Sequence, residues 1–328
     1  MISRVVRIVL FLAVAVSGVE ARQIPPDIPC DTSFTIHNTA EKIRRSHPQA
    51  TLVIPSLPQN VIAKENIVYA RIGTRDLHLD LFLPNSENNK PRPGVVLIYG
   101  GGWSSGNREM EWPMAQLLAA NGFATATVEY RLSPEALYPA AIYDLKAAIR
   151  WMRADASSCN IDPGKIAVYG CSAGGELASF LGSTGDLKKF EGDEGNSGIS
   201  TKVQAVINVD GILNFINPAD SAIDSNPGKP SAAHRWFGAS YKENLEIWKE
   251  ASPITYAGPD TPPTIFINSA LPRYHAGRDE LIAILNKFNI YTEVQTIPDT
   301  PHPFWLFHPW FEPTSEFILA FLHKTFDD

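Results

Sequence analysis

The chain has 328 residues, with 28 lysines and arginines against 35 aspartates and glutamates, a formal net charge of −7. This modestly acidic balance, without any basic run, argues against nucleic acid or an anionic membrane as a partner. The three cysteines are too few for a disulfide scaffold and lack metal-ligand spacing, although Cys30 and Cys159 remain a candidate pair.

The first 21 residues have the features of a signal peptide. Arg4 and Arg7 form a short positive start, the run VVRIVLFLAVAV is apolar, and the small residues of VEA follow at 19–21. The apolar run is shorter than the roughly 20 residues that span a bilayer, which disfavours the alternative of an uncleaved anchor. We therefore expect a secreted or periplasmic protein.

An N-terminal leader at residues 22–60 holds one short helical stretch, at 39–47, and from Val61 the chain alternates apolar and polar residues. Residues 77–83 (LHLDLFL) alternate with a period of two, which predicts a strand, and the preceding turn predicts a hairpin. Residues 93–100 (PGVVLIYG) are instead continuously apolar and end in glycines, as expected of a strand buried on both faces.

From this buried strand onward, predicted helices and strands alternate. The helices are expected at 110–122, 138–156, 172–181, 280–288 and 315–326, and the further strands at 123–130, 165–170, 203–210, 263–269 and 292–298. Such alternation predicts an α/β protein with a mostly parallel central sheet and helices on both faces. Residues 211–260 interrupt the pattern after the sixth strand. We therefore expect one domain at 61–328, with a short insertion over the edge of the sheet where the functional loops lie.

The strongest chemical signal is YGCSAGG, residues 169–175, which has the form G-x-S-x-G. It lies directly between a predicted buried strand and a predicted helix. A nucleophile on such a tight turn needs small neighbours, so that the strained backbone can project its hydroxyl. The helix N-terminus also favours developing negative charge. We predict Ser172 as a nucleophile, with a structural turn serine as the alternative.

A second glycine-rich stretch, YGGGWSSG at 99–106, ends another buried strand. Successive glycines let backbone N–H groups approach a ligand closely. The amides of Gly101 and Gly102, with that of Ala173, are candidates for an oxyanion hole. A phosphate cradle is the alternative, but the lysine of a P-loop and the dinucleotide glycine spacing are both missing.

A hydrolytic serine needs a base, and PDTPHPFW at 298–305 follows the last predicted strand. His302 on this late loop gives the order serine then histidine, and we predict it as the base. His275 and His308 compete as the nearest histidines in sequence. Each lies within or beside a probable helix or an aromatic cluster, and His308 is better explained by packing.

Together, YGGGW, EYRLSPEALYPAAIYDLKAAIRWM, IDPGKIAVYGCSAGGELAS and PHPFW resemble the α/β-hydrolase fold, in its hormone-sensitive-lipase-like and acetyl-esterase-like branch. The likeness covers roughly residues 60–325. That branch usually has HGGGW, and Tyr99 stands where the histidine is expected. Because the hole is built from backbone, this change should leave the glycine amides unaffected. The C-terminal part looks more like exported bacterial esterases that act on plant cell-wall polysaccharides, including pectin.

The resemblance leaves the acid of the triad open. The place where the fold usually carries an aspartate holds Pro272. Two candidates remain: Asp210, which ends the strand before the insertion, and Asp279, which is expected inside a helix beside Arg278. A carboxylate at a strand end can reach the histidine loop directly, so Asp210 is preferred. A serine–histidine dyad is a third alternative.

We also count Trp103, beside the glycine loop, and the three basic residues Arg273, His275 and Arg278 among candidate substrate contacts. Arginine binds both oxygens of a carboxylate, so this basic cluster predicts an anionic sugar such as a uronate. An internal pair with Asp279 is the alternative.

The expected function is a secreted serine esterase that removes acetyl or methyl esters from plant polysaccharide, without metal or organic cofactor. A general small-molecule carboxylesterase is the first alternative. A non-catalytic binding module on the same fold and a peptidase are less favoured.

Overall fold

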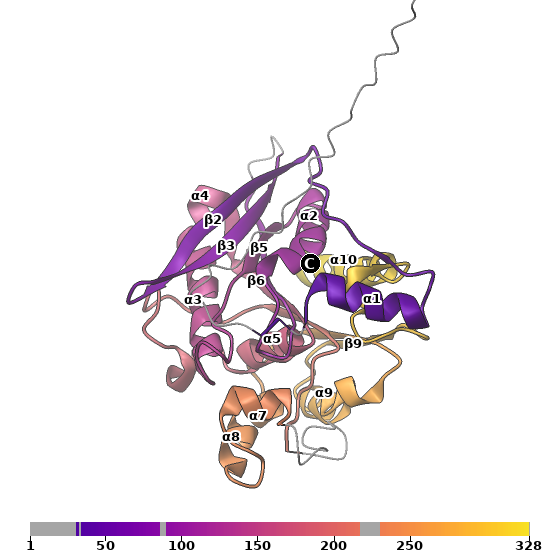
Figure 1. The fold of residues 1–328 in the computed structure, drawn as a ribbon. Helices are drawn as coiled ribbons and strands as arrows, with labels where there is room; N and C mark the ends of the chain where they lie inside the picture. The colour runs from indigo at the N-terminus through magenta and orange to yellow at the C-terminus, as the bar shows by residue number, and fades with distance from the viewer. Residues whose placement is uncertain (1–30, 33, 86–89, 217–229, 328) are drawn as a thin grey trace, which may run out of the picture.

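The centre of the molecule is an eight-stranded sheet with the strand order β2-β3-β5-β4-β6-β7-β8-β9 (Figure 1). The computed structural model describes residues 31–327 except 33, 86–89 and 217–229. In chain order the strands are β2 (Val61–Ile72), β3 (Arg75–Pro84), β4 (Arg92–Ile98), β5 (Ala124–Val128), β6 (Ile161–Cys171), β7 (Ala205–Val209), β8 (Thr264–Asn268) and β9 (Thr292–Thr296). The continuously apolar segments that predicted buried strands thus occupy the middle of the sheet.

The sheet is mostly parallel, as predicted. β2 and β3 form the expected antiparallel hairpin, and β3 also pairs antiparallel with β5. Every pairing from β5 through β4 to β9 is parallel. The carboxyl ends of these parallel strands therefore meet at one edge, where polar loops can converge.

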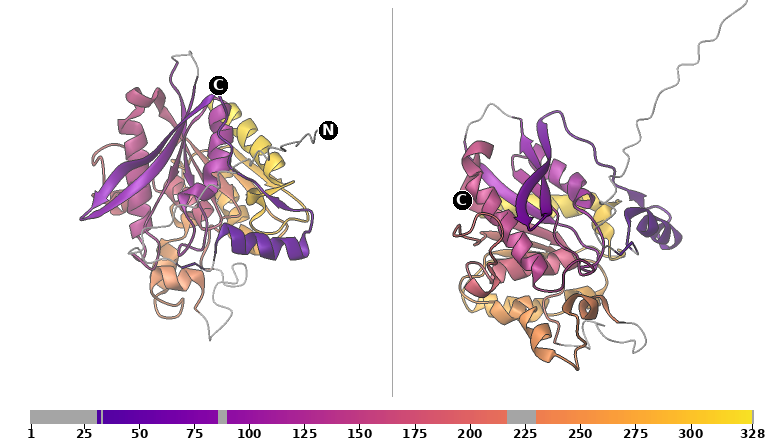
Figure 2. Two further views of the ribbon diagram at one scale, coloured as in Figure 1. Left: turned by 45° about the horizontal axis from the view of Figure 1, so that its top comes forward. Right: turned by 60° about the vertical axis from the view of Figure 1, so that its left-hand side comes forward.

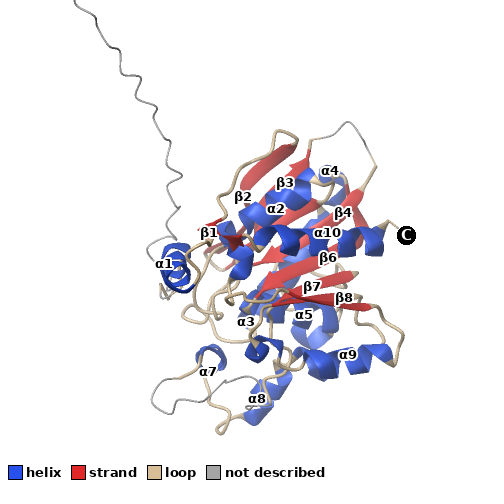
Figure 3. Ribbon diagram, turned by 90° about the vertical axis from the view of Figure 1, so that its right-hand side faces the viewer, coloured by secondary structure: helices blue, strands red, loops and turns tan. Residues whose placement is uncertain are grey.

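Helices cover both faces of the sheet (Figure 3). α2 (Trp112–Ala120) and α10 (Phe311–Phe326) lie together on one face, while α3 (Ala140–Ala154) and α5 (Ala173–Ser183) lie on the other. α9 (Arg278–Asn286) packs Leu281 and Leu285 against Phe266 of β8. The short α4 (Ala156–Cys159) precedes β6. This arrangement is the α/β-hydrolase fold.

The expected insertion follows β7, the sixth strand of the sheet, and contains α7 (Ala232–Phe237) and α8 (Leu245–Glu250). Figure 2 shows it in orange at one end of the molecule. Stacked and edge-on aromatic rings join the insertion to the core: Trp103, Phe215, Trp236, Phe237 and Trp248. Because these rings are buried, the insertion is packed onto the domain through a shared apolar cluster.

The leader is more ordered than the sequence indicates. α1 (Ile36–Ser46) covers the predicted helical stretch, and β1 (Thr51–Leu52) pairs antiparallel with β10 (Phe307–His308), which the sequence analysis missed. Two residues are too short for a periodic signal. The predicted signal peptide and Cys30 lie outside the described residues, so both remain hypotheses. In the described part of the chain, no helix has the length and apolar character needed to cross a membrane.

Candidate active site

Ser172 lies on the turn between β6 and α5, with φ 54° and ψ −120°. Close backbone packing makes this turn depend on glycine. A Cβ at Gly170 would lie 1.9 Å from the carbonyl oxygen of Gly174, and one at Gly174 would lie 2.2 Å from that of Ile98. The small residues around Ser172 therefore allow the strained turn that presents the hydroxyl at the sheet edge.

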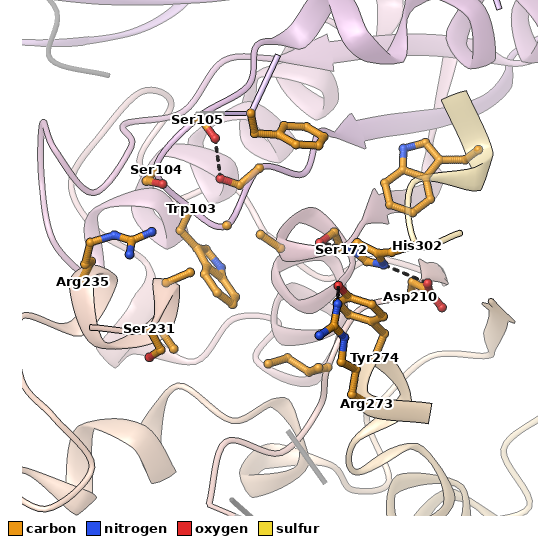
Figure 4. Close-up of a pocket in the computed structure, with 18 residues that line it drawn as sticks. Trp103, Ser104, Ser105, Ser172, Asp210, Ser231, Arg235, Arg273, Tyr274 and His302 are labelled. Carbon is orange, nitrogen blue, oxygen red and sulfur yellow. Dashed lines mark hydrogen bonds and ion pairs between the residues drawn. The ribbon is translucent and has the colours of Figure 1, made fainter. Parts of the chain in front are cut away.

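Three side chains form a continuous hydrogen-bonded chain at this edge (Figure 4). His302 Nε2 is 2.7 Å from Ser172 Oγ, and His302 Nδ1 is 2.9 Å from Asp210 Oδ2. An ionised carboxylate can only accept, so Nδ1 carries the proton and Nε2 is free to accept the serine proton. The geometry is that of a nucleophile, a base and an orienting acid.

Asp210 occupies the acid position, and Asp279 does not. Asp210 follows the last residue of β7, with φ 51°, and its Oδ1 also accepts from the backbone N–H of Ser269 at 2.7 Å. Asp279 lies in the first turn of α9 with its side chain 82% exposed, and its Oδ1 accepts from Arg278 Nε. The side chain that terminates a central strand reaches the histidine, as the preference for Asp210 anticipates.

Burial and hydrogen bonding act in opposite directions on this pair. Burial alone would raise the pKa of Asp210, but the nearby His275 and the hydrogen bond from His302 outweigh it and hold that pKa below its usual value. Burial lowers the pKa of His302, although the bond to Asp210 opposes the shift. The acid is therefore ionised and the imidazole neutral at neutral pH, the protonation states that a general base requires.

The glycine loop after β4, the predicted oxyanion hole, lies beside Ser172. Gly101 and Gly102 have φ values of 129° and 60°, and with Ala173 they line the cavity beside Ser172. A Cβ at Gly101 would lie 2.1 Å from the carbonyl oxygen of Ser105, so glycine is required there. The N–H groups of Ser104 and Ser105 donate to Gly101 O at 3.3 and 3.1 Å, which fixes the loop.

Tyr99 explains how the loop tolerates the loss of the family's usual histidine. Its side chain is buried and stacks on Tyr130, with 4.5 Å between ring centroids. Tyr130 Oη donates to the Tyr99 carbonyl oxygen at 3.0 Å. This contact holds the backbone between β4 and the glycine loop. The tyrosine that makes it lies in the buried core and does not line the cavity.

Trp103 lines the cavity, as predicted for a substrate contact. It has φ 56°, stacks on Trp236 with 4.8 Å between ring centroids, and its Nε1 donates to Glu176 Oε2 at 3.0 Å. Burial raises the pKa of Glu176 well above its usual value, although the hydrogen bond from Trp103 opposes the shift. Trp103 is thus a rigid wall between the glycine loop and the insertion.

The predicted basic cluster is divided by the structure. Arg273 lines the cavity, whereas Arg278 pairs with Asp279 and donates to Asn268 Oδ1 at 2.7 Å. His275 Nε2 lies 3.5 Å from Asp210 Oδ1. It therefore contacts the acid and is not one of the residues that line the cavity. The prediction of His275 and Arg278 as substrate contacts is therefore wrong. Arg273 and His275 lie in the 3-10 helix η4 (Pro272–His275), whereas Arg278 is the first residue of α9 and pairs on that helix.

The cavity beside Ser172 has a volume of about 420 Å³. Several of its lining residues were missed from sequence: Phe34, Ile212, Ala232, Arg235, Tyr274 and Trp305. They come from the leader, the insertion, η4 and the histidine loop, and no motif links such distant segments. His308, the rejected histidine, pairs instead with Glu312 on the surface. Among the described residues, no group of histidine, cysteine and acidic side chains has the arrangement of a metal site.

The sequence model of the BD-FAE family matches residues 79–279, which include Ser172 and Asp210. The chain belongs to the BD-FAE family. It is 30% identical over 248 residues to the probable carboxylic ester hydrolase LipM of Mycobacterium tuberculosis, covering 73% of this chain and 56% of LipM. The chain spans about half the length of the curated relatives that it matches.

Solved structures of esterases superpose on the chain. A truncated carbohydrate esterase from gut microbiota superposes with a TM-score of 0.68 at 26% identity, covering 82% of this chain and 99% of that one. Thermogutta terrifontis esterase 2 superposes with a TM-score of 0.66 at 23% identity, covering 82% of this chain and 96% of that one. The second likeness supports the fold alone.

Proposed function

We propose that the protein is a serine carboxylic ester hydrolase that works through an acyl-enzyme on Ser172. The observation that carries the proposal is the hydrogen-bonded chain from Ser172 through His302 to Asp210, beside a glycine loop that lines the same cavity. The names of two relatives, carboxylic ester hydrolase and esterase, support the same reaction class.

In acylation, His302 Nε2 accepts the proton of Ser172 Oγ as the oxygen attacks the ester carbonyl carbon. Asp210 stabilises the imidazolium that forms. The carbonyl oxygen becomes an oxyanion, for which we propose the backbone N–H groups of Gly101, Gly102 and Ala173 as donors. Collapse of the tetrahedral intermediate breaks the bond to the alcohol oxygen, which takes the proton from His302 Nε2 and leaves.

In deacylation, water takes the place of the alcohol. His302 accepts a proton from the water as its oxygen attacks the acyl carbonyl, and the same backbone donors receive the second oxyanion. Collapse returns the proton to Ser172 Oγ and releases the carboxylic acid. No redox step or further reactant is needed, because the two half-reactions balance with one ester and one water.

As the natural substrate we propose the acetyl or methyl esters of plant cell-wall polysaccharide such as pectin, met by a secreted or periplasmic enzyme. Two observations support a carbohydrate substrate. The likeness to a carbohydrate esterase extends over 99% of that chain. The cavity is also lined by aromatic side chains, among them Trp103 and Tyr274, whose apolar faces suit sugar rings.

A general small-molecule carboxylesterase is the second candidate. It is favoured by relatives whose names give no carbohydrate, including a Mycobacterium tuberculosis carboxylesterase that is 34% identical over 150 residues. A non-catalytic binding module on the same fold is disfavoured, because a binding site has no need of the aligned serine, histidine and aspartate.

The test is hydrolysis of para-nitrophenyl acetate, followed by product analysis on acetylated and methylated pectin and xylan. Turnover of the small ester supports the ester hydrolase, and its absence in folded protein refutes it. Release of acetate or methanol from a polysaccharide, at a higher kcat/KM than from the small ester, separates the first candidate from the second.

A further inference from the structure

The cavity beside Ser172 is lined by two arginines, Arg235 and Arg273, that have no acidic partner in the described part of the chain. Arg235 donates Nη1 to the carbonyl oxygen of Pro230, and Arg273 donates Nη2 to the hydroxyl of Tyr274. Among the described residues, neither forms an ion pair with a carboxylate. Other arginines of the chain do so: Arg71, Arg75, Arg108, Arg131, Arg150 and Arg278.

No acidic lining residue balances these two charges. Asp210 lines the cavity, but its carboxylate already accepts from His302 and from the backbone of Ser269, and His275 lies against it. The other described residues that line the cavity carry no carboxylate. In a chain with a net charge of −7, this is a local concentration of positive charge at the reacting centre.

Arg273 is held in a stack that reaches the base. The ring of Tyr274 lies nearly parallel to that of His302, with 3.4 Å between centroids and 9° between planes. The guanidinium carbon of Arg273 lies 4.6 Å from the centroid of the same tyrosine ring. Figure 4 shows Arg273 and Tyr274 beside His302, and Arg235 on the far side of Trp103. The stack sets the position of the Arg273 charge relative to the catalytic base.

The mechanism determines which part of an ester meets this stack. The leaving alcohol oxygen takes its proton from His302 Nε2, so the alcohol must lie on the side of the serine where His302 lies. The carbonyl oxygen lies toward Gly102 and Ala173. Tyr274 and Arg273 are next to His302, and they therefore border the alcohol portion of the substrate rather than its acyl portion.

We propose, on the basis of the ester hydrolase function above, that the alcohol portion of the substrate carries a carboxylate, as in an acidic sugar, and that Arg273 binds it. Arg273 keeps guanidinium donors beyond the one that bonds Tyr274, and a planar guanidinium matches a carboxylate. Arg235 adds positive potential from the opposite wall. An acyl group, by contrast, need carry no charge.

The same geometry couples binding to catalysis. The positive charge of Arg273 is one of the influences that lower the pKa of His302, after burial. A substrate carboxylate on Arg273 offsets that charge, so the imidazolium that forms during acylation is stabilised when the acidic substrate is bound. An anionic alcohol portion is thus expected to raise kcat as well as to lower KM.

The test compares meta-acetoxybenzoate with meta-acetoxybenzamide, two acetyl esters of similar size whose alcohol portions differ in charge, each rate being divided by that of alkaline hydrolysis of the same ester. We expect the wild-type protein to have a kcat/KM about tenfold higher for the anion, as a charge-assisted hydrogen bond would give. Arg273→Gln should abolish this ratio, which is measured within one variant and so does not depend on that variant's overall turnover. Arg71→Gln, which removes an arginine on the β2–β3 hairpin outside the cavity, is the matched control and should keep the ratio.

Equal values for the two esters in the wild-type protein, or a ratio that survives Arg273→Gln, would overturn the proposal. So would a larger loss of the ratio in Arg235→Gln than in Arg273→Gln. A further comparison places the anion in the acyl portion, with mono-para-nitrophenyl succinate against para-nitrophenyl butyrate. A preference for the succinate that depends on Arg273 would contradict the assignment to the alcohol side. Absence of para-nitrophenyl acetate turnover in every protein would instead refute the ester hydrolase itself.

Discussion

The turn from β6 to α5 and the turn that follows β8 both present residues to His302, but different forces hold them. Backbone crowding holds the first, where Gly170 and Gly174 leave no room for a Cβ. Side-chain stacking holds the second, where η4 carries Tyr274 against His302 and leaves Arg273 exposed. The comparison indicates that the chemistry is built on a rigid backbone, while recognition depends on a surface turn that tolerates substitution.

The largest expected effect is a loss of kcat when Ser172, on the turn from β6 to α5, is replaced. Ser172→Ala removes the nucleophile, and kcat on para-nitrophenyl acetate should fall on the order of a millionfold, as in other serine hydrolases. The far-ultraviolet circular dichroism and the melting temperature should stay close to wild type. Ser158→Ala, at an exposed serine at the end of α4, is the control. A folded Ser172→Ala protein with a tenth of wild-type kcat would contradict the mechanism.

The next effect separates the two candidate acids. Asp210→Asn should lower kcat by about four orders of magnitude, because the amide favours the wrong tautomer of His302. Asp279→Asn should remain near wild type, since its exposed carboxylate contacts Arg278. The measurement is kcat and KM on para-nitrophenyl acetate for both variants. The reverse pattern would show that the acid comes from α9 instead of from the end of β7.

A stability measurement addresses the crowding at the first turn. Gly174→Ala should destabilise the fold by about 3 kcal/mol or more, because its Cβ would meet the carbonyl oxygen of Ile98, a backbone atom that cannot move alone. Gly258→Ala, whose Cβ would meet nothing closer than 3.9 Å, is the matched control. Urea unfolding of both variants gives the difference. Equal midpoints would mean that the turn relaxes more freely than its packing indicates.

The smallest expected effect is on the pH dependence of kcat/KM. Only neutral His302 can act as the base, and its pKa is lowered mainly by burial, so kcat/KM should stay high to a pH below the ordinary histidine value. It should fall at lower pH as His302 gains a proton. Because the Arg273 charge contributes to the lowering, Arg273→Gln should move the midpoint upward, whereas Arg71→Gln should not. The measurement is the pH profile of kcat/KM, and a wild-type midpoint above the ordinary value would contradict it.

Much of the fold could be predicted because its signals are local. The period-two alternation of β3, the apolar run of β4 and the alternation of later strands and helices each lie within a few residues. The β1–β10 pair could not be found in this way, since it joins two-residue strands more than 250 positions apart in sequence.

The sequence by itself determined the position of Ser172, the glycine loop and the late histidine, because glycine spacing and strand ends are properties of one stretch of chain. Only the tertiary structure decided which aspartate meets His302, since that depends on β7 lying next to β6 and β8. It also decided that Arg273 lines the cavity while His275 and Arg278 do not. Arg273 and His275 lie in η4 and Arg278 begins α9, so these near neighbours in sequence belong to different elements, and the rest of the fold determines what each of them contacts.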